Sequence, residues 1–579
     1  MKQSNQSSRH VCYSLTSLIA SAIAVVSPFD VQASAVIFGS YTSVQVNVDQ
    51  FGQNIPGDLG NEPTIALNPI NPSNMVVGWR LRPPASTLIS AGSAFTLNQG
   101  SSWQVSPILP ALPNQKRTDP ALDVDSLGNF YFQSYATGGG VPDANSVFKS
   151  VDGGASWGAP VYQFSGDRNF IAIDRTGGIG EGNIYSVWSS DSNPDPNYLP
   201  KYFVRSTDQG ASYQQPVDDL PVYVGFGRMT VGPEGEVYIS GRDWLSDTYE
   251  AGTVFENYYF MKSLDAKNPD VSPTFTAKAV DMGGRPIDLS MNAPNPRGGM
   301  TEVVIASDHS QSAMRGNIYM LTNVLPNDFQ SCDPVDPESC VLNDIMDIHF
   351  VSSVDGGETW SLPVRVNDDP AKPTSIQWFP MMGVAPNSRI DAVWYDTRNG
   401  SGAKPYRMSQ LYYSYSWDGG VTWSPNKPVT PEFNTHLPYD TGTENQKDKL
   451  GDYAQLVSDA NGAHVAYAAT FNGEQDVYYL NVFPDCNNNA LSDVQDIELR
   501  RSGDINGNHQ PDSCENITVI GDIDGDKDVD QLDINLVNAA KNKPANGPTD
   551  PRDLDHNGVI NLLDARKQTL LCTRPRCAV

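Results

Sequence analysis

Basic residues are scarce in this chain of 579 residues: 38 Lys and Arg stand against 67 Asp and Glu, which leaves a net charge of −29. A chain this acidic repels nucleic-acid phosphates and anionic lipid headgroups, so both are poor partners for it. Long apolar runs are absent beyond the N-terminus, which excludes a protein with several membrane-spanning helices.

Several catalytic and metal-binding motifs are also missing. The sequence contains no P-loop, no His-Glu-x-x-His and no Cys-x-x-Cys, and its seven His are scattered. These absences disfavour the chemistry of P-loop nucleotide-binding proteins, zinc proteases and zinc fingers. Glycoside hydrolysis by two carboxyl groups stays open, because it requires only Asp and Glu side chains.

The N-terminus has the features of an export signal. A short basic stretch precedes a mostly apolar run from Val11 to Val26, and Ala33-Ser34-Ala35 offers a small-x-small cleavage site. We expect residues 1–35 to be a signal peptide and the mature chain to be secreted; a membrane anchor is the alternative and would need a longer apolar run.

The cysteines agree with an oxidising environment. One of the seven, Cys12, lies in the signal, and the other six allow fifteen connectivities. Local spacing favours three pairs, which are Cys332/Cys340, Cys486/Cys514 and Cys572/Cys577.

The chain is too long for one ordinary core, since single cores stop growing near ~250–300 residues, and an internal repeat explains the length. The pattern Ser-x-Asp-x-Gly-x-Thr/Ser-Trp/Tyr occurs at 150–157, 206–213, 353–360 and 416–423, with a weaker copy at 96–103. These residue types suit a β-hairpin turn: Asp and Ser hydrogen-bond the local backbone, Gly supplies positive φ, and we expect the aromatic residue to pack against its own sheet.

These copies resemble the Asp-box (BNR) repeat of sialidase-like β-propellers over roughly residues 43–484. The resemblance implies that each box joins the third and fourth strands of a blade. It also implies that the Asp residues of the boxes are structural rather than catalytic.

A second repeated unit, an apolar strand, a Gly/Asn turn and another apolar strand, predicts the number of blades. Seven such units start near residues 62, 119, 169, 228, 302, 378 and 452. The last unit lacks a box, and the strand-like stretch Val44–Val48 is free to complete it and close the ring. We therefore expect an all-β propeller of seven blades over residues 36–484, with six blades as the alternative.

The C-terminal region is acidic in a regular pattern. Residues 485–564 hold 17 Asp and Glu against 6 Lys and Arg. Their spacing matches helix–loop calcium sites, which take oxygen ligands at positions 1, 3, 5, 9 and 12 of a loop. The predicted Ca²⁺ ligands are Asp485, Asn487, Asn489, Asp493 and Asp496; Asp504, Asn506, Asn508, Asp512 and Glu515; Asp522, Asp524, Asp526, Asp530 and Asp533; and Asp553, Asp555, Asn557, Asn561 and Asp564.

The last two loops resemble a dockerin, which we assign to residues 517–579, and residues 485–516 form a related pair bridged by Cys486 and Cys514. The resemblance implies docking to a cohesin-like protein. The sequence departs from it at Lys527, where glycine is usual, and at Leu532, Leu562 and Leu563, where many dockerins carry small hydroxyl residues.

The resemblance implies that the starts of the inner strands and the loops between the second and third strands meet on the face opposite the boxes, and charged residues gather at these positions. They are Glu62, Arg80, Arg82, Arg117, Asp119, Asp167, Arg168, Asp191, Arg228, Arg242, Asp243, Glu302, Asp396, Arg398, Asp452 and the neighbouring Tyr453. Arg–carboxylate pairs that seal the ring are the structural interpretation of this set. Substrate binding by the Arg forks is the functional one.

The resemblance to sialidases implies a Tyr nucleophile, a Glu that assists it, an Asp acid/base and Arg residues that bind a substrate carboxylate. Tyr453, Glu302 and Asp396 are the corresponding catalytic candidates, and Arg398, Arg242, Arg168 and Arg82 are the binding candidates. The first clamp Arg of that family is missing, because its place reads Asn61-Glu62-Pro63-Thr64. We therefore expect a secreted, glycan-active propeller, with a hydrolase of anionic sugars as one form and a non-catalytic binding scaffold as the other.

Overall fold

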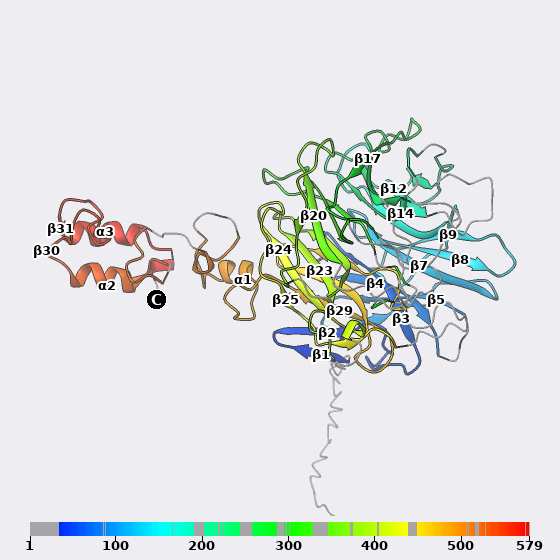
Figure 1. The fold of residues 1–579 in the computed structure, drawn as a ribbon, viewed down its shortest axis with the longest axis horizontal. Coiled ribbons are helices and arrows are strands. Elements are labelled where there is room, and N and C mark those ends of the chain that lie inside the picture. The colour runs from blue at the N-terminus through cyan, green and yellow to red at the C-terminus, as the bar shows by residue number, and fades with distance from the viewer. Residues whose placement is uncertain are drawn as a thin grey trace, which may run out of the picture.

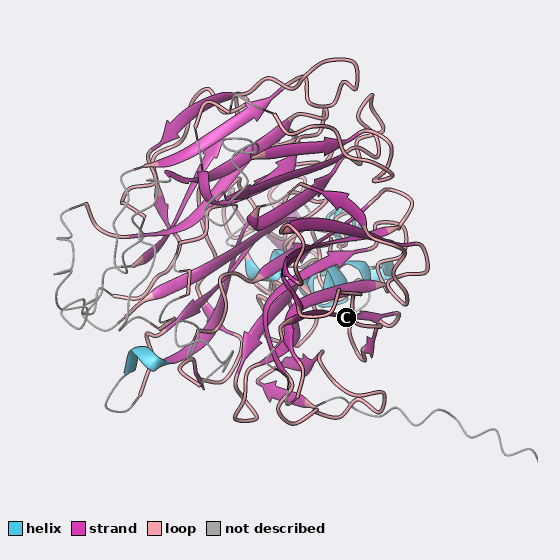
Figure 2. Ribbon diagram, turned by 90° about the vertical axis from the view of Figure 1, so that its right-hand side faces the viewer, coloured by secondary structure: helices cyan, strands magenta, loops and turns pink. Residues whose placement is uncertain are grey.

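The chain folds into a ring of seven β-sheets with a separate helical tail, seen in the computed structural model in Figure 1. The structure describes residues 34–577 except 85, 87, 165, 190–201, 218–219, 223, 244–256, 287–293, 296–297, 300, 328–345, 371–374, 402–404, 438–448, 505–506, 508, 516–519, 527 and 574. The predicted signal peptide and the Cys332/Cys340 pair lie outside the described residues. Strands dominate the fold (Figure 2).

Each blade is an antiparallel meander that begins at the axis of the ring. Blade one holds β3 (Leu59–Leu67), β4 (Met75–Arg82), β5 (Ser90–Thr96) and β6 (Gln104–Val105). Blade two holds β7 (Gln115–Val124), β8 (Phe130–Gly138), β9 (Ala144–Ser150) and β10 (Val161–Gln163), and blade three holds β11 (Asp167–Ile173), β12 (Ile184–Ser189) and β13 (Phe203–Ser206). Blade four holds β14 (Val224–Val231), β15 (Val237–Asp243), β16 (Tyr258–Ser263) and β17 (Thr276–Val280). Blade five holds β18 (Val304–Ser307), β19 (Ile318–Val324), β20 (Asp347–Ser353) and β21 (Val364–Arg365). Blade six holds β22 (Gln377–Val384), β23 (Ile390–Asp396), β24 (Met408–Ser416) and β25 (Lys427–Pro428), with β26 (Phe433–Asn434) beside β24.

The seventh blade joins the two ends of the propeller and confirms the predicted closure. Its order is β1 (Ala35–Phe38), β2 (Tyr41–Gln45), β29 (Asp476–Val482), β28 (Ala463–Ala469) and β27 (Gln455–Ser458). The N-terminal strand β2 pairs with β29, and beyond β2 the Val46 N–H donates to the Val477 carbonyl at 2.8 Å. The seven-blade prediction is confirmed, and six blades are excluded.

The box turns have the hydrogen bonds that their residue types predict. In the 353–360 copy, the Ser353 hydroxyl donates to Asp355 Oδ1 at 2.8 Å, and the Thr359 N–H donates to the same oxygen at 2.8 Å. The Gly357 N–H donates to Ser353 Oγ at 2.9 Å. The other three full copies repeat this set with nearly the same distances.

The box aromatics pack both within and between blades. Trp157 lies edge-on to Phe132 of its own blade, with 5.3 Å between ring centroids, as expected, but two other copies differ. Trp360 of blade five lies edge-on to Phe260 of blade four, with 5.3 Å between ring centroids, and Trp423 of blade six contacts Phe350 of blade five at 5.2 Å. The turn thus reaches across to the preceding blade, because the apolar core of this fold lies between the faces of adjacent sheets. The box aromatic holds blades together as well as closing its own turn.

The tail leaves the ring beside β24 and β25 (Figure 1). It carries three helices, α1 (Asp493–Glu498), α2 (Gln531–Ala539) and α3 (Leu562–Leu570), and a small strand pair of β30 (Lys543–Pro544) and β31 (Val559–Ile560). Short 3-10 turns lie at Asp512–Cys514 and Pro575–Cys577 of the tail, and one in the ring, Pro405–Arg407, precedes β24. Disulfides join Cys486 to Cys514 and Cys572 to Cys577. No helix among the described residues is long and apolar enough to cross a membrane.

Candidate functional site

The inner strands of the ring carry irregularities at matching positions. Register shifts interrupt the pairing of the first two strands in blades one, two, three, four and six. Four residues in these bulges have positive φ: Glu62 (53°), Asp119 (50°), Arg168 (55°) and Phe379 (46°). Non-glycine residues rarely adopt this conformation, which is concentrated at sites where structure is held for function. The bulges turn the start of each inner strand, so their side chains differ in direction from those of a regular strand.

Around these bulges lies a group of buried and half-buried polar side chains, which we call the axial cluster. It comprises Glu62, Arg80, Asp119, Asp167, Arg168, Arg228, Glu302, Lys449, Asp452 and Tyr453. Contacts and electrostatic effects among these residues connect blades one to five with blade seven.

Arg228 and Glu302 form one half of the axial cluster. Glu302 Oε1 accepts hydrogen bonds from Arg228 Nε at 2.6 Å and Nη2 at 2.5 Å. The guanidinium also lies over the ring of Phe170, 3.9 Å from the centroid, and 5.4 Å from the centroid of Tyr453. Glu302 Oε2 is buried and accepts no hydrogen bond from the described residues. Burial raises the pKa of Glu302 to about 7, although Arg228 opposes the shift.

Lys449 forms the other half. Its ammonium lies 2.6 Å from Asp452 Oδ2 and 3.3 Å from Glu62 Oε1, and Glu62 Oε1 is also 3.3 Å from Arg80 Nη1. Asp452 is buried, but the charges of Lys449 and Arg168 outweigh that burial and hold its pKa below the usual value. Burial raises the pKa of Glu62 despite the nearby cations. The Gly299 N–H adds a 2.8 Å hydrogen bond to Asp452 Oδ1.

Asp119 lies between these groups and blade three. Burial, and then the charge and hydrogen bond of Asp167, raise the pKa of Asp119 to about 8. Asp119 Oδ2 accepts a 2.7 Å hydrogen bond from the backbone N–H of Arg168. This bond connects the residues with positive φ in blades two and three. Asp119 therefore retains a proton at neutral pH, whereas Asp452 is ionised.

Tyr453 lies among these residues as the sequence predicts, but its hydroxyl is engaged. The side chain is 3% exposed, packs edge-on against Phe170, and donates a 3.0 Å hydrogen bond to the Pro120 carbonyl. Burial, and then the charges of Glu62 and Asp119, raise the pKa of Tyr453 well above its ordinary value. The phenol is a hydrogen-bond donor in this arrangement and not a phenolate.

An axial cavity of about 160 Å³ lies next to the cluster. All seven inner strands line it, mostly with apolar side chains such as Leu122, Ile305 and Met381, and Arg228 is its charged residue. The cavity is large enough for several water molecules. The axial cluster therefore borders a cavity that the inner strands enclose, and Arg228 belongs to both.

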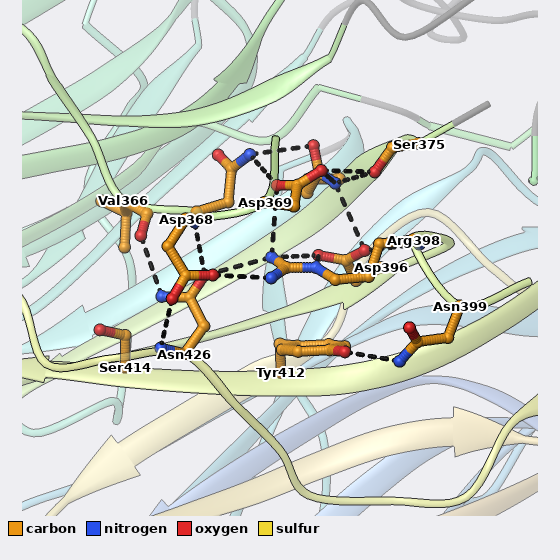
Figure 3. Close-up of polar contacts among 12 residues, drawn as sticks. Val366, Asp368, Asp369, Ser375, Asp396, Arg398, Asn399, Tyr412, Ser414 and Asn426 are labelled. Atoms are coloured by element: carbon orange, nitrogen blue, oxygen red, sulfur yellow. Dashed lines mark hydrogen bonds and ion pairs between the residues drawn. The ribbon is translucent and has the colours of Figure 1, made fainter. Parts of the chain in front are cut away.

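Asp396 and Arg398 lie outside the axial cluster. Arg398 donates to Asp396 at 2.8 Å, to Asp368 at 2.7 Å and to the Asn426 side chain at 3.1 Å, and its guanidinium covers the Tyr412 ring (Figure 3). Asp396 also accepts the Trp394 indole N–H at 2.9 Å. No contact among the described residues joins this network to Tyr453 or Glu302. A carboxylate whose hydrogen-bonding capacity is filled in this way has the geometry of a structural ion pair.

The other predicted clamp residues also separate. Arg242 is fully buried in β15 and donates to the Asp243 carbonyl at 3.2 Å, and Arg82 donates to the Ser86 carbonyl at 3.0 Å. Among the four predicted binding residues, Arg168 belongs to the axial cluster: its charge lowers the pKa of Asp452, and its backbone N–H donates to Asp119. The sequence prediction selected Glu302, Tyr453 and Arg168 from the axial cluster. It named Asp119, Arg228 and Asp452 among the charged residues of this face without a site role, and it did not name Lys449.

A sequence signal for Asp119, one of the missed residues, does exist. Proline follows the bulged residue at Pro63, Pro120 and Pro380, inside segments that otherwise have the pattern of a central strand. Proline cannot donate to a sheet ladder, so within sheets it is confined to edges and bulges. Three prolines at the same offset therefore mark the bulged positions.

The predicted calcium ligands converge in part. Carboxylate oxygens of Asp522, Asp524 and Asp533 lie within 4.8 Å of one another, as do those of Asp553, Asp555 and Asp564. These residues hold positions 1, 3 and 12 of their loops. At position 9, Asp530 and Asn561 cap α2 and α3 by accepting backbone N–H groups. In the first loop, the side-chain amides of Asn487 and Asn489 each donate a 2.8 Å hydrogen bond to the Asp496 carboxylate. Asp493 of this loop accepts the Cys486 N–H. In the second loop, Asn506 and Asn508 lie outside the described residues. The donor set is all oxygen, which fits Ca²⁺.

Comparison with known proteins adds a limited likeness. No protein-family model matches the chain. A curated ulvan lyase (long isoform) from Glaciecola sp. (strain KUL10) is 41% identical over 63 residues, which is 11% of this chain and 6% of that protein.

Three solved structures of similar fold share 12–14% identity with this chain. They include a protein of unknown function from Dyadobacter fermentans DSM 18053 (14% identity; 76% of this chain, 98% of that one; TM-score 0.38) and a Hadza microbial sialidase (13%; 73% and 65%; 0.35). A polysaccharide lyase PL25 ulvan lyase is 12% identical and covers 77% of this chain and 94% of that one, with a TM-score of 0.39. Likeness at this level transfers no site residue to this chain.

Proposed function

We propose that this chain is an exported, glycan-active propeller whose catalytic centre is the axial cluster. The observation that supports this is the opposite displacement of pKa values at one point. The pKa of Asp119 is raised to about 8 and that of Glu302 to about 7, while that of Asp452 is lowered, and all three affect or contact neighbours of Tyr453. Carboxyl groups whose environments separate their pKa values are suited to acid and base roles.

In the proposed hydrolysis Asp119 or Glu302 donates a proton to the leaving oxygen as the glycosidic bond breaks, and the ionised carboxylate of Asp452 takes a proton from the water molecule that forms the new bond to the sugar carbon. Tyr453 donates a hydrogen bond rather than acting as a nucleophile, because its proton is retained. Arg168, Arg228 and Lys449 provide the positive charge that would orient an anionic sugar. This reassigns the acid role from Asp396, which lies in the network of blade six.

A non-catalytic binding propeller is the second candidate. The observation that favours it is that Arg228, Arg80 and Arg398 each form an ion pair with a neighbouring carboxylate. An Arg fork in such a pair binds a substrate carboxylate only by displacing its partner. In this case the same pairs would hold the ring together, and the glycan would bind without bond cleavage.

A substrate screen separates the two candidates. The purified full chain is incubated with a sialic-acid reporter and a panel of neutral, uronic-acid and sulfated polysaccharides, and products are followed by reducing ends and by the ultraviolet absorbance of unsaturated sugars. Catalysis predicts turnover that falls about 100-fold or more in Asp119→Asn and Glu302→Gln, since acid–base groups contribute about 10²–10⁴-fold. Asp123→Asn, on the same strand as Asp119, is the matched control and retains turnover. Glycan binding without turnover would support the scaffold and exclude the hydrolase.

We further propose that the tail binds Ca²⁺ through the four loops and is stabilised by it. The convergence of positions 1, 3 and 12 in the last two loops supports this. Chelation is expected to lower the melting temperature of the tail, and Asp564→Asn is expected to reduce the number of bound ions. A melting curve and ion content unchanged by chelator would contradict the proposal. Docking of the tail to a cohesin-like protein stays a prediction.

A further inference from the structure

Arg117 is a buried arginine that has no carboxylate partner among the described residues. It lies in β7, the inner strand of blade two, two residues before Asp119 of the axial cluster. The residue is 5% exposed, and one guanidinium nitrogen, Nη1, is fully buried and has no hydrogen-bond partner in the described part of the chain. Buried charges are normally paired, because a charge that leaves water without a partner costs free energy.

Two contacts hold the Arg117 side chain. Its Nε donates a 2.7 Å hydrogen bond to the Pro110 carbonyl, and the guanidinium carbon lies 4.9 Å from the centroid of the Phe148 ring. Neither partner carries a negative charge. Burial lowers the pKa of Arg117 to about 10, so the guanidinium still carries its charge at neutral pH.

Two other buried arginines show how this ring satisfies a guanidinium. Arg389 forms a bidentate ion pair with Asp391, with Nε 2.8 Å from Oδ1 and Nη2 2.9 Å from Oδ2. All three nitrogens of Arg205 donate hydrogen bonds, Nε to the Gln214 side chain and the two terminal nitrogens to four backbone carbonyls. In the Arg117 side chain only Nε donates to a described residue, although a guanidinium has five N–H groups.

Arg117 lies toward the face of the ring opposite the boxes. It pairs with Ala136 across the ladder, close to the end of β8 at Gly138, whereas the box of this blade follows β9 at the other end of the sheet. The segment from Pro110 to Asn114, which precedes β7, is exposed. Because the Pro110 carbonyl contacts the guanidinium, the Arg117 side chain lies directly beneath this exposed segment.

The chemistry of the Arg117 side chain selects oxyanions. A guanidinium donates two parallel hydrogen bonds to a carboxylate or a tetrahedral oxyanion, which match its planar fork. Asp119, the closest acidic residue along β7, retains its proton at neutral pH and therefore offers no negative charge. The neighbouring Lys116 adds a second positive charge to the same strand.

We propose that Arg117 forms an oxyanion-binding subsite, which takes a sulfate ester or a carboxylate of the glycan that occupies the axial cluster. The identity of the ligand as a glycan rests on the proposed function, whereas binding of a free oxyanion does not depend on catalysis. The ligand supplies the negative charge that the described residues do not. Two residues of a strand span about 7 Å, so the subsite lies beside Asp119 and would hold a sugar next to the reacting one.

Titration of the full chain with inorganic sulfate and with glucuronate tests the subsite without requiring turnover. Calorimetry at constant ionic strength is expected to show saturable binding to wild type. Arg117→Met should weaken this binding at least about tenfold, because a hydrogen bond to a charged group contributes about that factor. Lys116→Gln is the matched control, since it removes one positive charge from the adjacent, half-buried position and should bind as wild type does. Glucose, which is uncharged, should show no binding that depends on Arg117.

Thermal unfolding separates ligand binding from a structural role of Arg117. Without added oxyanion, Arg117→Met is expected to melt at or above the temperature of wild type, because it removes a buried charge without a partner and keeps an apolar side chain on Phe148. Sulfate stabilises proteins generally, so the comparison is between variants: it should raise the melting temperature of wild type and Lys116→Gln more than that of Arg117→Met. Arg117→Gln repeats both measurements if Arg117→Met does not fold.

Matched neutral, uronic-acid and sulfated oligosaccharides identify the source of the oxyanion, because the class whose affinity falls in Arg117→Met is the one that the subsite takes. The proposal is overturned if wild type shows no saturable binding of either oxyanion, or if a folded Arg117 variant binds every class as wild type does. Binding that depends on Arg117 in a chain without turnover would refute only the hydrolysis. Turnover with binding that is independent of Arg117 would refute only the subsite.

Discussion

The Arg228–Glu302 pair allows a quantitative test of how the axial cluster is held together. Arg228 contacts Glu302 through two nitrogens, and the side chains are 11% and 2% exposed. Two unit charges about 4 Å apart attract by about 4 kcal/mol at an effective dielectric constant of about 20. Removal of one partner leaves the other buried and uncompensated, and such changes cost about 3–5 kcal/mol.

We therefore expect Glu302→Gln and Arg228→Met each to lower the free energy of unfolding by about 3–5 kcal/mol. The double variant should recover about 2 kcal/mol or more of the summed loss, because it leaves neither charge buried alone. The Arg175–Asp123 pair is an exposed comparison, with a 2.6 Å contact but an Arg175 that is 40% exposed. Arg175→Met should cost less than about 1 kcal/mol.

Urea unfolding of the four variants, followed by tryptophan fluorescence, measures the coupling. If the losses of the two single variants simply add in the double variant, the pair does not stabilise the ring as argued. A loss in Glu302→Gln no larger than in Arg175→Met would also refute the reasoning, since burial would then have no effect.

Three further outcomes follow from the structure. Gly357→Ala should destabilise the propeller by about 2–4 kcal/mol in urea unfolding, because φ of Gly357 is +84° and a Cβ there would lie 2.1 Å from the Phe260 ring. Gly356→Ala is the comparison: no atom lies within reach of a Cβ there, so this variant should cost only about 1 kcal/mol. The pKa of Asp119 is about 8 in the folded chain and about 4 in the unfolded chain. Its contribution to stability is therefore complete below pH 4 and is lost as the pH rises to 8. The free energy of unfolding, measured from pH 4 to 9 for wild type and Asp119→Asn, should accordingly shift in favour of the variant as the pH rises. Calcium should raise the melting temperature of the tail in wild type and less in Asp564→Asn by differential scanning calorimetry, and an equal rise in both would count against the loop assignment.

Much of the fold was predictable because its signals are local. The box fixes a turn through contacts within eight residues, such as Ser353 to Asp355, and its repetition sets the number of blades. Closure by the segment near Val44 was predictable because the last unit lacked a strand. The direction of the box tryptophans was not, since Trp360 meets Phe260 only once the neighbouring blade is in place.

The axial site was less predictable for a physical reason. Tyr453 and Glu302 were found from strand positions, but the placement of Lys449 between Glu62 and Asp452 depends on contacts across blades. Charge alone also did not indicate that Arg228 belongs to the axial cluster and Arg398 does not. Both form ion pairs, and only the structure shows that Arg398 lies in the network of blade six.

The strained bulges bear on whether the axial cluster is only structural. A ring that needed sealing alone could be closed with apolar side chains, and replacing buried ion pairs by such residues is often neutral or stabilising. Instead, Glu62, Asp119 and Arg168 adopt positive φ, at about 1–3 kcal/mol each. A site that acts on a ligand explains why both the backbone strain and the buried charges are retained, whereas a scaffold requires neither.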